Sequence, residues 1–404
     1  MVPEDWKVEP LSKLLEKIID YRGQSVPKAK SGIPLITARN VRAGFIDFSA
    51  KEYVSEEAFD AWMSRGIPSK GDILFTTEAP LGNACRFPET GRYAVGQRTV
   101  SLRPNEKLLN AEYLLYFLLS ERGQRLIDLR SSGSTAKGIK SSELKKVKIT
   151  LPSELPEQKK IAQILSTWDQ AITATERLLE NSQQRKKGLM QQLLTGKKRL
   201  PGFEGEWGKV KLASVAEMSS GGTPKSSVNE YYNGDIPWVS IADMTSKGKW
   251  IDCTEKNLSK LGIDNSSARL YPAKTVLYAM YASIGECSIA RVPVSSSQAI
   301  LGIRPGKDLH YEFLYFYLSS LKEEIKLQGQ QGTQSNLNAG MVKGFKIPLP
   351  SLQEQIGISE VLNSADEEIE ALEKSIFALK QEKKALMQQL LTGKRRVQVD
   401  MEAA

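Results

Sequence analysis

The sequence predicts an α+β protein in which two pseudo-symmetric globular domains are separated by two long helices that form an antiparallel coiled coil. The prediction rests on an internal duplication, on a heptad pattern at the end of each copy, and on a mixture of strand-like and helix-like segments before each heptad pattern.

The chain of 404 residues repeats itself. Residues 188–197 (GLMQQLLTGK) recur as residues 385–394 (ALMQQLLTGK), 197 residues later. At the same offset Glu157-Gln158 recurs as Glu354-Gln355. Trp6 has a counterpart in Trp207, at a slightly different offset. A repeat unit of nearly half the chain indicates a duplicated domain rather than a solenoid of short repeats.

Each copy ends in a segment whose apolar residues alternate at spacings of three and four, which is typical of a coiled-coil seam. Prolines stand at the predicted helix starts, and Gly196 and Gly393 stand at the predicted ends. Each helix should cover about 40 residues, or about 60 Å. The first seam is Leu165, Trp168, Ile172, Thr175, Leu179, Ser182, Lys186, Leu189 and Leu193; the second is Leu362, Ala365, Ile369, Leu372, Ile376, Leu379, Lys383, Leu386 and Leu390.

The seams contain one lysine each, Lys186 and Lys383. Parallel pairing in register would place these like charges against each other, whereas antiparallel pairing separates them, so the sequence favours the antiparallel arrangement. The two lysines either face a partner subunit or specify the register of the coil. An equally simple interpretation is that their aliphatic stems extend out of the seam.

These features divide the chain into a first globular domain (1–150), a first helical segment (151–200), a second globular domain (201–347), a second helical segment (348–397) and a disordered tail (398–404). Within the domains, residues 71–75, 99–102, 274–278 and 299–303 have the β-branched and aromatic content of buried strands. Residues 112–119 and 312–321 read as amphipathic helices whose aromatic side chains belong to the core.

The composition limits the possible functions. Lys and Arg number 56 against 47 Asp and Glu, a net charge of +9, which favours a polyanionic partner such as nucleic acid. One histidine and three cysteines without C-x-x-C spacing argue against a metal site and against a disulfide framework. No signal peptide and no long apolar run is present, so we expect a cytoplasmic protein without a membrane partner.

Motifs for chemistry are also missing. The sequence contains no G-x-x-x-x-G-K-[ST] phosphate loop and no Asn-Pro-Pro-aromatic or Asp-Pro-Pro-aromatic motif. We therefore expect no catalytic residues and no cofactor in this chain.

Polar loops lie between the predicted elements. Arg recognises the edge of guanine, Asn and Gln recognise adenine, and Lys and Thr hold phosphates. A single loop of this kind is more simply a solvated turn, but several of them on a duplicated basic scaffold favour DNA. The candidate DNA-contacting residues are Arg22, Gln24, Lys28, Arg39, Asn40, Arg42, Thr135, Lys137, Lys225 and Asn336.

Several segments together make the chain similar to the specificity subunits of type I restriction–modification systems. They are Gly221–Pro224, Gly234–Ser240, Gly332–Gln334 with residues 347–350, and the twice-occurring LMQQLLTGK. The resemblance implies two target recognition domains, each reading half of a split DNA sequence. It also places Gly222, Thr223, Gly332, Thr333 and Gln334 in loops near DNA. The first half departs from the pattern because it has residues 23–27 (GQSVP) in place of a Gly-Gly-Thr-Pro loop.

The resemblance further implies that the helices bind two methyltransferase subunits, which motor-nuclease subunits join. Those partners are expected to use S-adenosylmethionine, ATP and Mg²⁺. The residues expected to form the coil or to face a partner are Leu165, Ile172, Leu179, Lys186, Leu193, Leu362, Ile369, Ile376, Lys383 and Leu390. Two alternatives remain open at this point: a coiled-coil scaffold that binds proteins rather than DNA, and an enzyme that acts alone on DNA.

Overall fold

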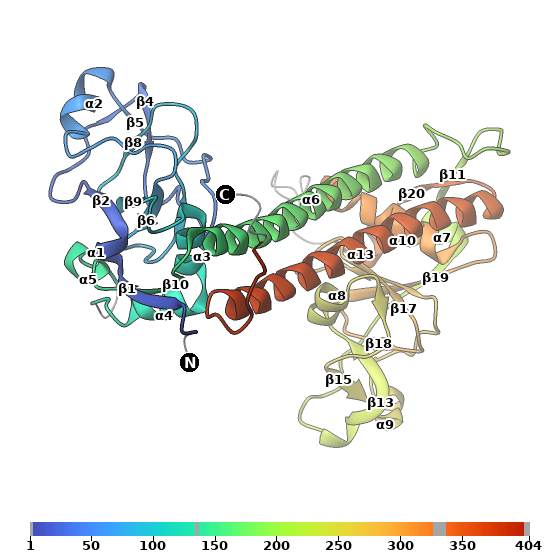
Figure 1. Ribbon diagram of the computed structural model, residues 1–404. Coiled ribbons are helices and arrows are strands. Elements are labelled where there is room, and N and C mark those ends of the chain that lie inside the picture. Colours follow the sequence, from blue (N-terminus) through green and yellow to red (C-terminus); the bar gives the residue numbers. More distant parts are fainter. Residues whose placement is uncertain (1–2, 134–136, 326–336, 400–404) are drawn as a thin grey trace. The chain divides into compact units, whose positions relative to one another are not determined.

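The computed structural model describes residues 3–133, 137–325 and 337–399. The chain forms two compact units: unit 1 comprises Met1–Glu176 and Lys374–Ala404, and unit 2 comprises Arg177–Glu373. Two helices of 39 residues each, α6 (Leu155–Leu193) and α13 (Leu352–Leu390), are shared between the units (Figure 1). Each unit is therefore a globular domain together with one part of each long helix.

Unit 1 is built on a four-stranded sheet of order β2-β9-β6-β7, a second sheet of order β3-β5-β4-β8 and a β1–β10 pair. The elements are β1 (Trp6–Pro10), α1 (Leu11–Leu14), β2 (Leu15–Asp20), β3 (Lys28–Ala29), β4 (Ile33–Ile36), β5 (Tyr53–Val54), α2 (Glu56–Trp62), β6 (Ile73–Thr76), β7 (Ala84–Arg86), β8 (Ala94–Val95), β9 (Thr99–Pro104), α3 (Ala111–Leu119), α4 (Glu121–Asp128), α5 (Ser141–Leu144) and β10 (Lys148–Pro152).

Unit 2 repeats this plan with sheets of order β12-β19-β16-β17-β14 and β15-β13-β18 and a β11–β20 pair. The elements are β11 (Gly208–Lys211), α7 (Leu212–Val215), β12 (Ala216–Ser220), η1 (Asn229–Tyr231), β13 (Tyr232–Val239), α8 (Ile241–Lys247), β14 (Trp250–Ile251), β15 (Lys256–Leu258), α9 (Lys260–Asp264), β16 (Val276–Ala279), β17 (Cys287–Ala290), β18 (Ser295–Ser296), β19 (Ile300–Pro305), α10 (Tyr311–Ser320), α12 (Ala339–Lys343) and β20 (Lys346–Leu349).

The strands and helices expected from the sequence are present. The four strand-like segments form β6, β9, β16 and β19. These are interior strands of the β2-β9-β6-β7 and β12-β19-β16-β17-β14 sheets. The two amphipathic segments form α3 and α10, and their aromatic residues Tyr113, Tyr116, Phe117, Phe313 and Phe316 are buried. Burying such large side chains is the main source of stability for a domain of this size, so these rings serve the core and are not available to stack on bases.

The duplicated Glu-Gln pair holds each helix start to its own domain. The amide of Gln158 accepts a hydrogen bond from the Asn110 backbone (2.9 Å) and donates to the Pro152 carbonyl (3.0 Å). Gln355 does the same in unit 2 with His310 (2.7 Å) and Pro350 (2.9 Å). A buried amide must be hydrogen-bonded, so these contacts fix the turn before α3 or α10 against the long helix.

Within each unit the two long helices run antiparallel, as the sequence predicts. In unit 1, Asp169 and Glu176 of α6 pair with Lys383 (2.5 Å) and Lys380 (2.7 Å) of α13, so the partners move backward along α13 as α6 advances. In unit 2 the partners of Ser182 and Lys186 are Glu368 and Asp366, in the same sense. Every predicted seam residue on both helices is buried or half-buried.

The seam lysines are paired rather than free. Lys383 binds Asp169 and Lys186 binds Asp366, and both members of the second pair differ from those of the first by the 197-residue offset of the duplication. Each ammonium also lies over a ring of its own unit, Tyr116 at 5.3 Å or Phe316 at 5.8 Å. Because a half-buried charge is costly without its partner, these pairs favour one register of the coil.

The long helices end at the predicted glycines. Gly196 and Gly393 have φ of 72° and 73°, the left-handed region in which a side chain is disfavoured. Arginines follow and close each unit: Arg199 pairs with Glu354 (2.6 Å), and Arg396 pairs with Glu157 (2.8 Å) and with Asp5. The described residues near the two ends of the chain, such as Asp5 and Arg396, consequently lie side by side in unit 1.

Among the residues described, no helix combines the length and apolar character needed to cross a membrane. The three cysteines, Cys85, Cys253 and Cys287, are free thiols in this structure. Cys85 and Cys287 are buried, and burial raises the pKa of the Cys85 thiol to about 12. These two thiols therefore act as small apolar side chains of the core.

Replacing Asp169 by Lys should place two lysines in the seam of unit 1. We expect a loss of about 2 kcal/mol in the free energy of unfolding, the usual worth of a hydrogen bond to a charged group. The double variant Asp169→Lys/Lys383→Asp should recover at least half of that loss in urea unfolding. As a control, Glu176→Lys changes an exposed pair and should cost less than about 1 kcal/mol. A double variant no more stable than the single one would contradict the register role.

Candidate nucleic-acid interface

Several loops of unit 1 meet at one edge of its β2-β9-β6-β7 sheet. Strand β9 is antiparallel to both β2 and β6, so it begins where those strands end: Asp20 lies opposite Val100, and Thr76 opposite Thr99. The loops after β2 and β6 and the turn before β9 therefore share this edge. We call Arg22, Glu78, Gln97 and Arg98 the first loop edge.

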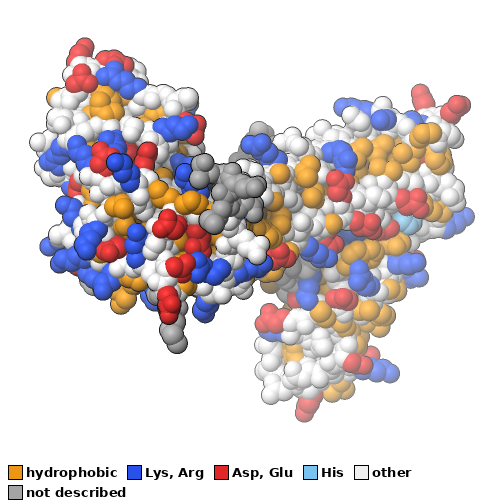
Figure 2. Space-filling model, in the orientation of Figure 1, with side chains coloured by type: hydrophobic (Ala, Val, Ile, Leu, Met, Phe, Trp, Pro, Cys, Tyr) orange, Lys and Arg blue, Asp and Glu red, His pale blue; other side chains and the backbone are white. Residues whose placement is uncertain are grey.

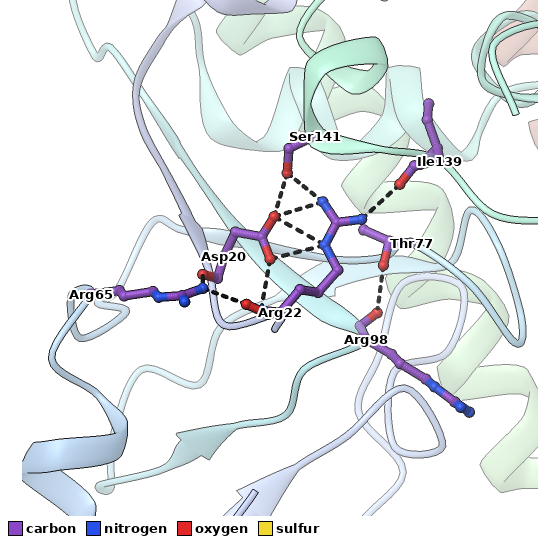
Figure 3. A network of polar contacts seen from close by, with 7 residues as sticks. All are labelled: Asp20, Arg22, Arg65, Thr77, Arg98, Ile139 and Ser141. Atoms are coloured by element: carbon purple, nitrogen blue, oxygen red, sulfur yellow. Dashed lines mark hydrogen bonds and ion pairs between the residues drawn. The ribbon is translucent and has the colours of Figure 1, made fainter. Parts of the chain in front are cut away.

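A polar network holds the first loop edge together (Figure 3). The Arg22 guanidinium donates Nε and Nη2 to the carboxylate of Asp20 (3.0 and 2.6 Å) and Nη1 to the Ile139 carbonyl (3.0 Å). The Ser141 hydroxyl bonds to the same carboxylate and receives a hydrogen bond from Arg22. Arg65 donates to the carbonyls of Asp20 (2.7 Å) and Arg22 (2.6 Å). The network ties the end of β2 to the segment before α5.

Backbone hydrogen bonds extend this connection across the edge. The amide of Ile139 donates to the Thr77 carbonyl (2.9 Å), and the amide of Thr77 donates to the Arg98 carbonyl (3.0 Å). Burial works to raise the pKa of the Asp20 carboxyl, but the hydrogen bonds from Arg22 and Ser141 outweigh it, so its pKa lies below the ordinary value. The Asp20–Arg22 ion pair is therefore maintained at neutral pH.

Arg22 and Arg98, the two arginines of this edge, have different roles. The sequence predicts Arg22 as a DNA contact, but its guanidinium is occupied by Asp20, Ile139 and Ser141, so in this structure it positions the loop. The Arg98 side chain points away from the network (Figure 3) and is 54% exposed. It contacts only the half-exposed Glu78 (3.1 Å) among the described carboxylates, so its donors remain accessible.

The loop after β4 reaches the same edge because β4 and β8 are parallel. The Gly96 amide donates to the Ile36 carbonyl (2.8 Å), which places the loop of residues 37–42 beside Gln97. Arg39 and Arg42 are exposed there, and Arg42 pairs with Asp47 (3.3 Å). Asn40, a predicted base contact, is 2% exposed. Its side chain is hydrogen-bonded to the Thr37 hydroxyl and to the carbonyls of Asp47 and Ala50. It shapes the loop from the interior.

Of the remaining predicted residues of unit 1, Lys137 lies next to Gly138, which forms a backbone bridge with Glu78 of this edge. Gln24 is exposed in the loop after β2. Lys28 lies in β3 and pairs with Glu52 (2.7 Å), and Lys137 pairs with Asp128 (2.5 Å). Thr135 lies outside the described residues.

Unit 2 has an equivalent edge. The Met280 amide donates to the Ala299 carbonyl (2.9 Å), and the Leu337 amide donates to the Met280 carbonyl (3.1 Å). These are the counterparts of the Thr77–Arg98 and Ile139–Thr77 bonds of unit 1. The end of β12, the end of β16 and the start of β19 therefore meet as they do in unit 1. We call Thr223 and Gln298 the second loop edge.

The side chains of the second loop edge differ from those of the first. Thr223 and Gln298 are both exposed, and the Thr223 hydroxyl donates to the Gln298 side-chain oxygen. Gly222 is buried, and a Cβ added there would meet backbone atoms of Ser267 and Ala268 at 2.4 and 2.5 Å. Gly222 is thus required for close packing rather than placed to touch a ligand.

Lys225 is exposed on the loop that follows Thr223. Gly332, Thr333, Gln334 and Asn336, the other predicted contacts of the second half, lie outside the described residues.

Gln97, Arg98 and Gln298 are not among the DNA contacts predicted from the sequence. The signal was available: each glutamine stands six residues before a duplicated Arg-Pro, at Arg103 and Arg304. What the sequence does not show is that the turn before β9 or β19 lies at the same edge as the loop after β2 or β12. Strand pairing establishes this.

The two edges present guanidinium and amide groups, which are the groups that recognise base edges in DNA. Lys and Arg side chains are spread over the visible face of both units among Asp and Glu (Figure 2). Within the part of the chain that the structure describes, no group of three or more His, Cys, Asp or Glu could hold a metal ion.

Comparisons with known proteins agree on one family. The sequence profile described as "Type I restriction modification DNA specificity domain" matches residues 3–181 and 204–381. A Methanocaldococcus jannaschii protein assigned as the MjaX specificity subunit of a type I restriction enzyme is 27% identical, over 98% of this chain and 95% of its own length. The MjaVIII specificity subunit of the same organism is 25% identical, over 98% and 94%.

Solved structures show the same fold. A chain from a structure on complex assembly and conformational transition of the type I R-M system matches with a TM-score of 0.63 at 20% identity, covering 98% of this chain and all of its own. The HsdS subunit from Thermoanaerobacter tengcongensis matches with a TM-score of 0.53 at 20% identity, covering 98% of both chains.

Replacing Asp20 by Asn should weaken the network of the first loop edge. The stabilisation that a lowered carboxyl pKa provides is present above the unfolded value, about 3.9, and is lost as the pH falls through the lower folded value. We expect the variant to lose about 1–3 kcal/mol of unfolding free energy at pH 7. Below about pH 4 its stability should fall less steeply than that of the wild type.

Urea unfolding at a series of pH values measures both effects. Asp60→Asn is the control, because the Asp60 side chain is 83% exposed and its removal should change little. Equal acid sensitivity of the Asp20→Asn variant and the wild type would show that this carboxylate does not support the edge.

Proposed function

Because the chain belongs to the type I restriction modification DNA specificity family, we propose that it is the subunit of a type I restriction–modification complex that selects the DNA sequence. In this proposal each unit reads one half of a two-part target. The relatives named above support it, since they carry such names and match along nearly the whole chain.

The observation that carries the proposal is the pair of equivalent loop edges. The backbone bonds of Ile139, Thr77 and Arg98 in unit 1 have counterparts in Leu337, Met280 and Ala299 in unit 2. The exposed side chains at the two edges are nevertheless different. A shared scaffold with different polar groups fits the reading of two unlike half-sites.

The chemistry of each edge suggests how reading would proceed. The exposed Arg98 guanidinium suits the two acceptors of guanine in the major groove, and the Gln298 amide suits adenine. Arg39 and Lys225, exposed on neighbouring loops, suit phosphates. Arg22 and Asn40 would act indirectly, by fixing the loops that carry these groups.

The same proposal assigns the chemistry to partners. Two methyltransferase subunits and motor-nuclease subunits would bind this chain and use S-adenosylmethionine, ATP and Mg²⁺, while this chain supplies none of the reacting groups. Helices α6 and α13 are the natural docking elements; Phe377 of α13, for example, lies outside the seam and is 67% exposed. A scaffold that binds only proteins is not favoured, because the relatives are named as restriction enzyme subunits.

Selection of bound duplexes from a random DNA library tests the function. We expect two conserved half-sites with an unspecified spacer between them, and affinity that falls steeply with added salt. Arg98→Gln should relax one half-site and Gln298→Ala the other, each costing about 1–3 kcal/mol of discrimination. Given Mg²⁺, ATP and S-adenosylmethionine, the purified chain should leave the DNA unchanged. Sequence-independent binding, or loss of both half-sites in either variant, would contradict the proposal.

The length of the helices should set the spacer. Deleting residues 175–181 and 372–378 removes one heptad from each helix at equivalent positions and keeps the Asp169–Lys383 and Lys186–Asp366 pairs. Each helix becomes shorter by about 10 Å. We expect the selected spacer to shorten by about three base pairs, at about 3.4 Å each. The same selection on the intact chain is the control, and an unchanged spacer would exclude this role for the helices.

A further inference from the structure

A basic groove lies in unit 1 between α4 and the last turns of α13. Its volume is about 670 Å³, and its walls carry six cationic side chains against one carboxylate, Glu121. We call this groove, with its lining cations Arg122, Arg125, Lys380, Lys383, Lys384 and Lys394, the basic groove. An excess of this kind creates a local positive potential that attracts anions.

Neighbouring carboxylates balance only part of this charge. Lys383 pairs with Asp169, Lys380 with Glu176 (2.7 Å) and Lys384 with Glu121 (2.8 Å). Arg122, Arg125 and Lys394 form no ion pair with any carboxylate in the described parts of the chain. Among the described residues, these three positive charges of the groove have no ion-pair partner.

The fold itself does not require this charge, as unit 2 demonstrates. At the corresponding place, the start of the segment that follows α10, Leu321 and Ile325 stand where unit 1 has Glu121 and Arg125. Both pack against the core of unit 2 together with Met190, the counterpart of Met387. Lys322, the counterpart of Arg122, is paired with Glu286. At this corner unit 2 therefore has apolar side chains that pack against its core, where unit 1 has Glu121 and Arg125.

The groove adjoins the first loop edge. Gln124 of α4 donates to the carbonyl of Gly82 (2.8 Å), in the hairpin that carries Glu78. Gly44, in the hairpin that follows Arg42, lies against Leu119, which lines the groove. The elements that carry the groove therefore contact the hairpins that follow Arg42 and Glu78.

We propose that the basic groove binds the phosphate backbone of the DNA duplex beside the half-site read by unit 1. This inference rests on the proposed function and extends it, because it assigns extra anchoring to one of the two half-sites. Guanidinium and ammonium groups on an exposed rim suit phosphates. The competing occupant, an acidic protein segment, would present carboxylates to the same cations, and the experiments below distinguish it from DNA.

Neutralising the unpaired cations tests the proposal. In the full chain, the variant Arg122→Gln/Arg125→Gln/Lys394→Gln is compared with the wild type on a duplex that contains both selected half-sites. Each lost phosphate contact lowers the slope of log affinity against log salt by about 0.9. We expect the slope to fall by about 2 to 3 while the selected bases stay the same, because no base-reading group has changed.

A matched control removes three positive charges at the opposite end of the sheet of unit 1. Lys13, Lys107 and Lys145 are exposed there: the Asn105 turn bonds to Leu14, and Ser12 bonds to Lys145. The triple Gln variant of these lysines should keep the wild-type slope. Equal slopes in the groove variant and the wild type would overturn the proposal, and so would equal losses in groove and control variants.

Hydroxyl-radical footprinting gives a second readout. The groove variant should lose protection of the backbone beside the half-site that Arg98→Gln relaxes. Loss beside the other half-site, or an unchanged DNA footprint together with lost binding of a polyglutamate peptide, would overturn the assignment to DNA. If the wild-type chain showed no sequence-selective binding, the proposed function itself would fail, a result distinct from failure of the groove.

Discussion

The arrangement of this protein depends on two equivalent ion pairs at the seam of its long helices. Asp169 with Lys383 in unit 1, and Asp366 with Lys186 in unit 2, place a charge in a half-buried position where it is tolerated only opposite its partner. Helices held in this antiparallel register bring the start of one to the end of the other within each unit. The Arg396–Glu157 and Arg199–Glu354 pairs then close the two units in the same way.

A scaffold fixed in this way leaves the loop edges free to differ. The order β2-β9-β6-β7 of unit 1 recurs as β12-β19-β16-β17 in unit 2, and the same backbone bonds form where the loops converge, so the position of the exposed groups does not depend on their identity. Unit 1 adds the Asp20–Arg22–Ser141 network, whereas unit 2 achieves close packing with Gly221 and Gly222. Two local solutions support one architecture, which is the expected result when a domain duplicates and its binding surface then diverges.

The candidate site was partly predictable. The sequence indicated which loops carry polar groups, and Arg39, Thr223 and Lys225 are indeed exposed at or near the edges. The sequence did not distinguish these exposed residues from Arg22 and Asn40. Arg22 and Asn40 carry the same kinds of donor, but their donors are hydrogen-bonded to Asp20 and to loop carbonyls. Whether a guanidinium or amide is free depends on neighbours distant in sequence, such as Ser141 for Arg22, and residue type alone does not report it.

The sequence by itself determined the duplication, the two long helices, their seams and their ends, because heptad spacing and a terminal glycine are local signals with direct physical consequences. The tertiary structure alone decided what the seam lysines do and which polar loops converge. It also decided that the corner beside α4 is a cationic groove in unit 1, whereas the equivalent residues Leu321 and Ile325 of unit 2 pack against its core. Those outcomes arise from contacts between residues far apart in the sequence, such as Asp20 with Val100 and Asp169 with Lys383, where strand pairing and helix register, rather than local propensity, set the neighbours.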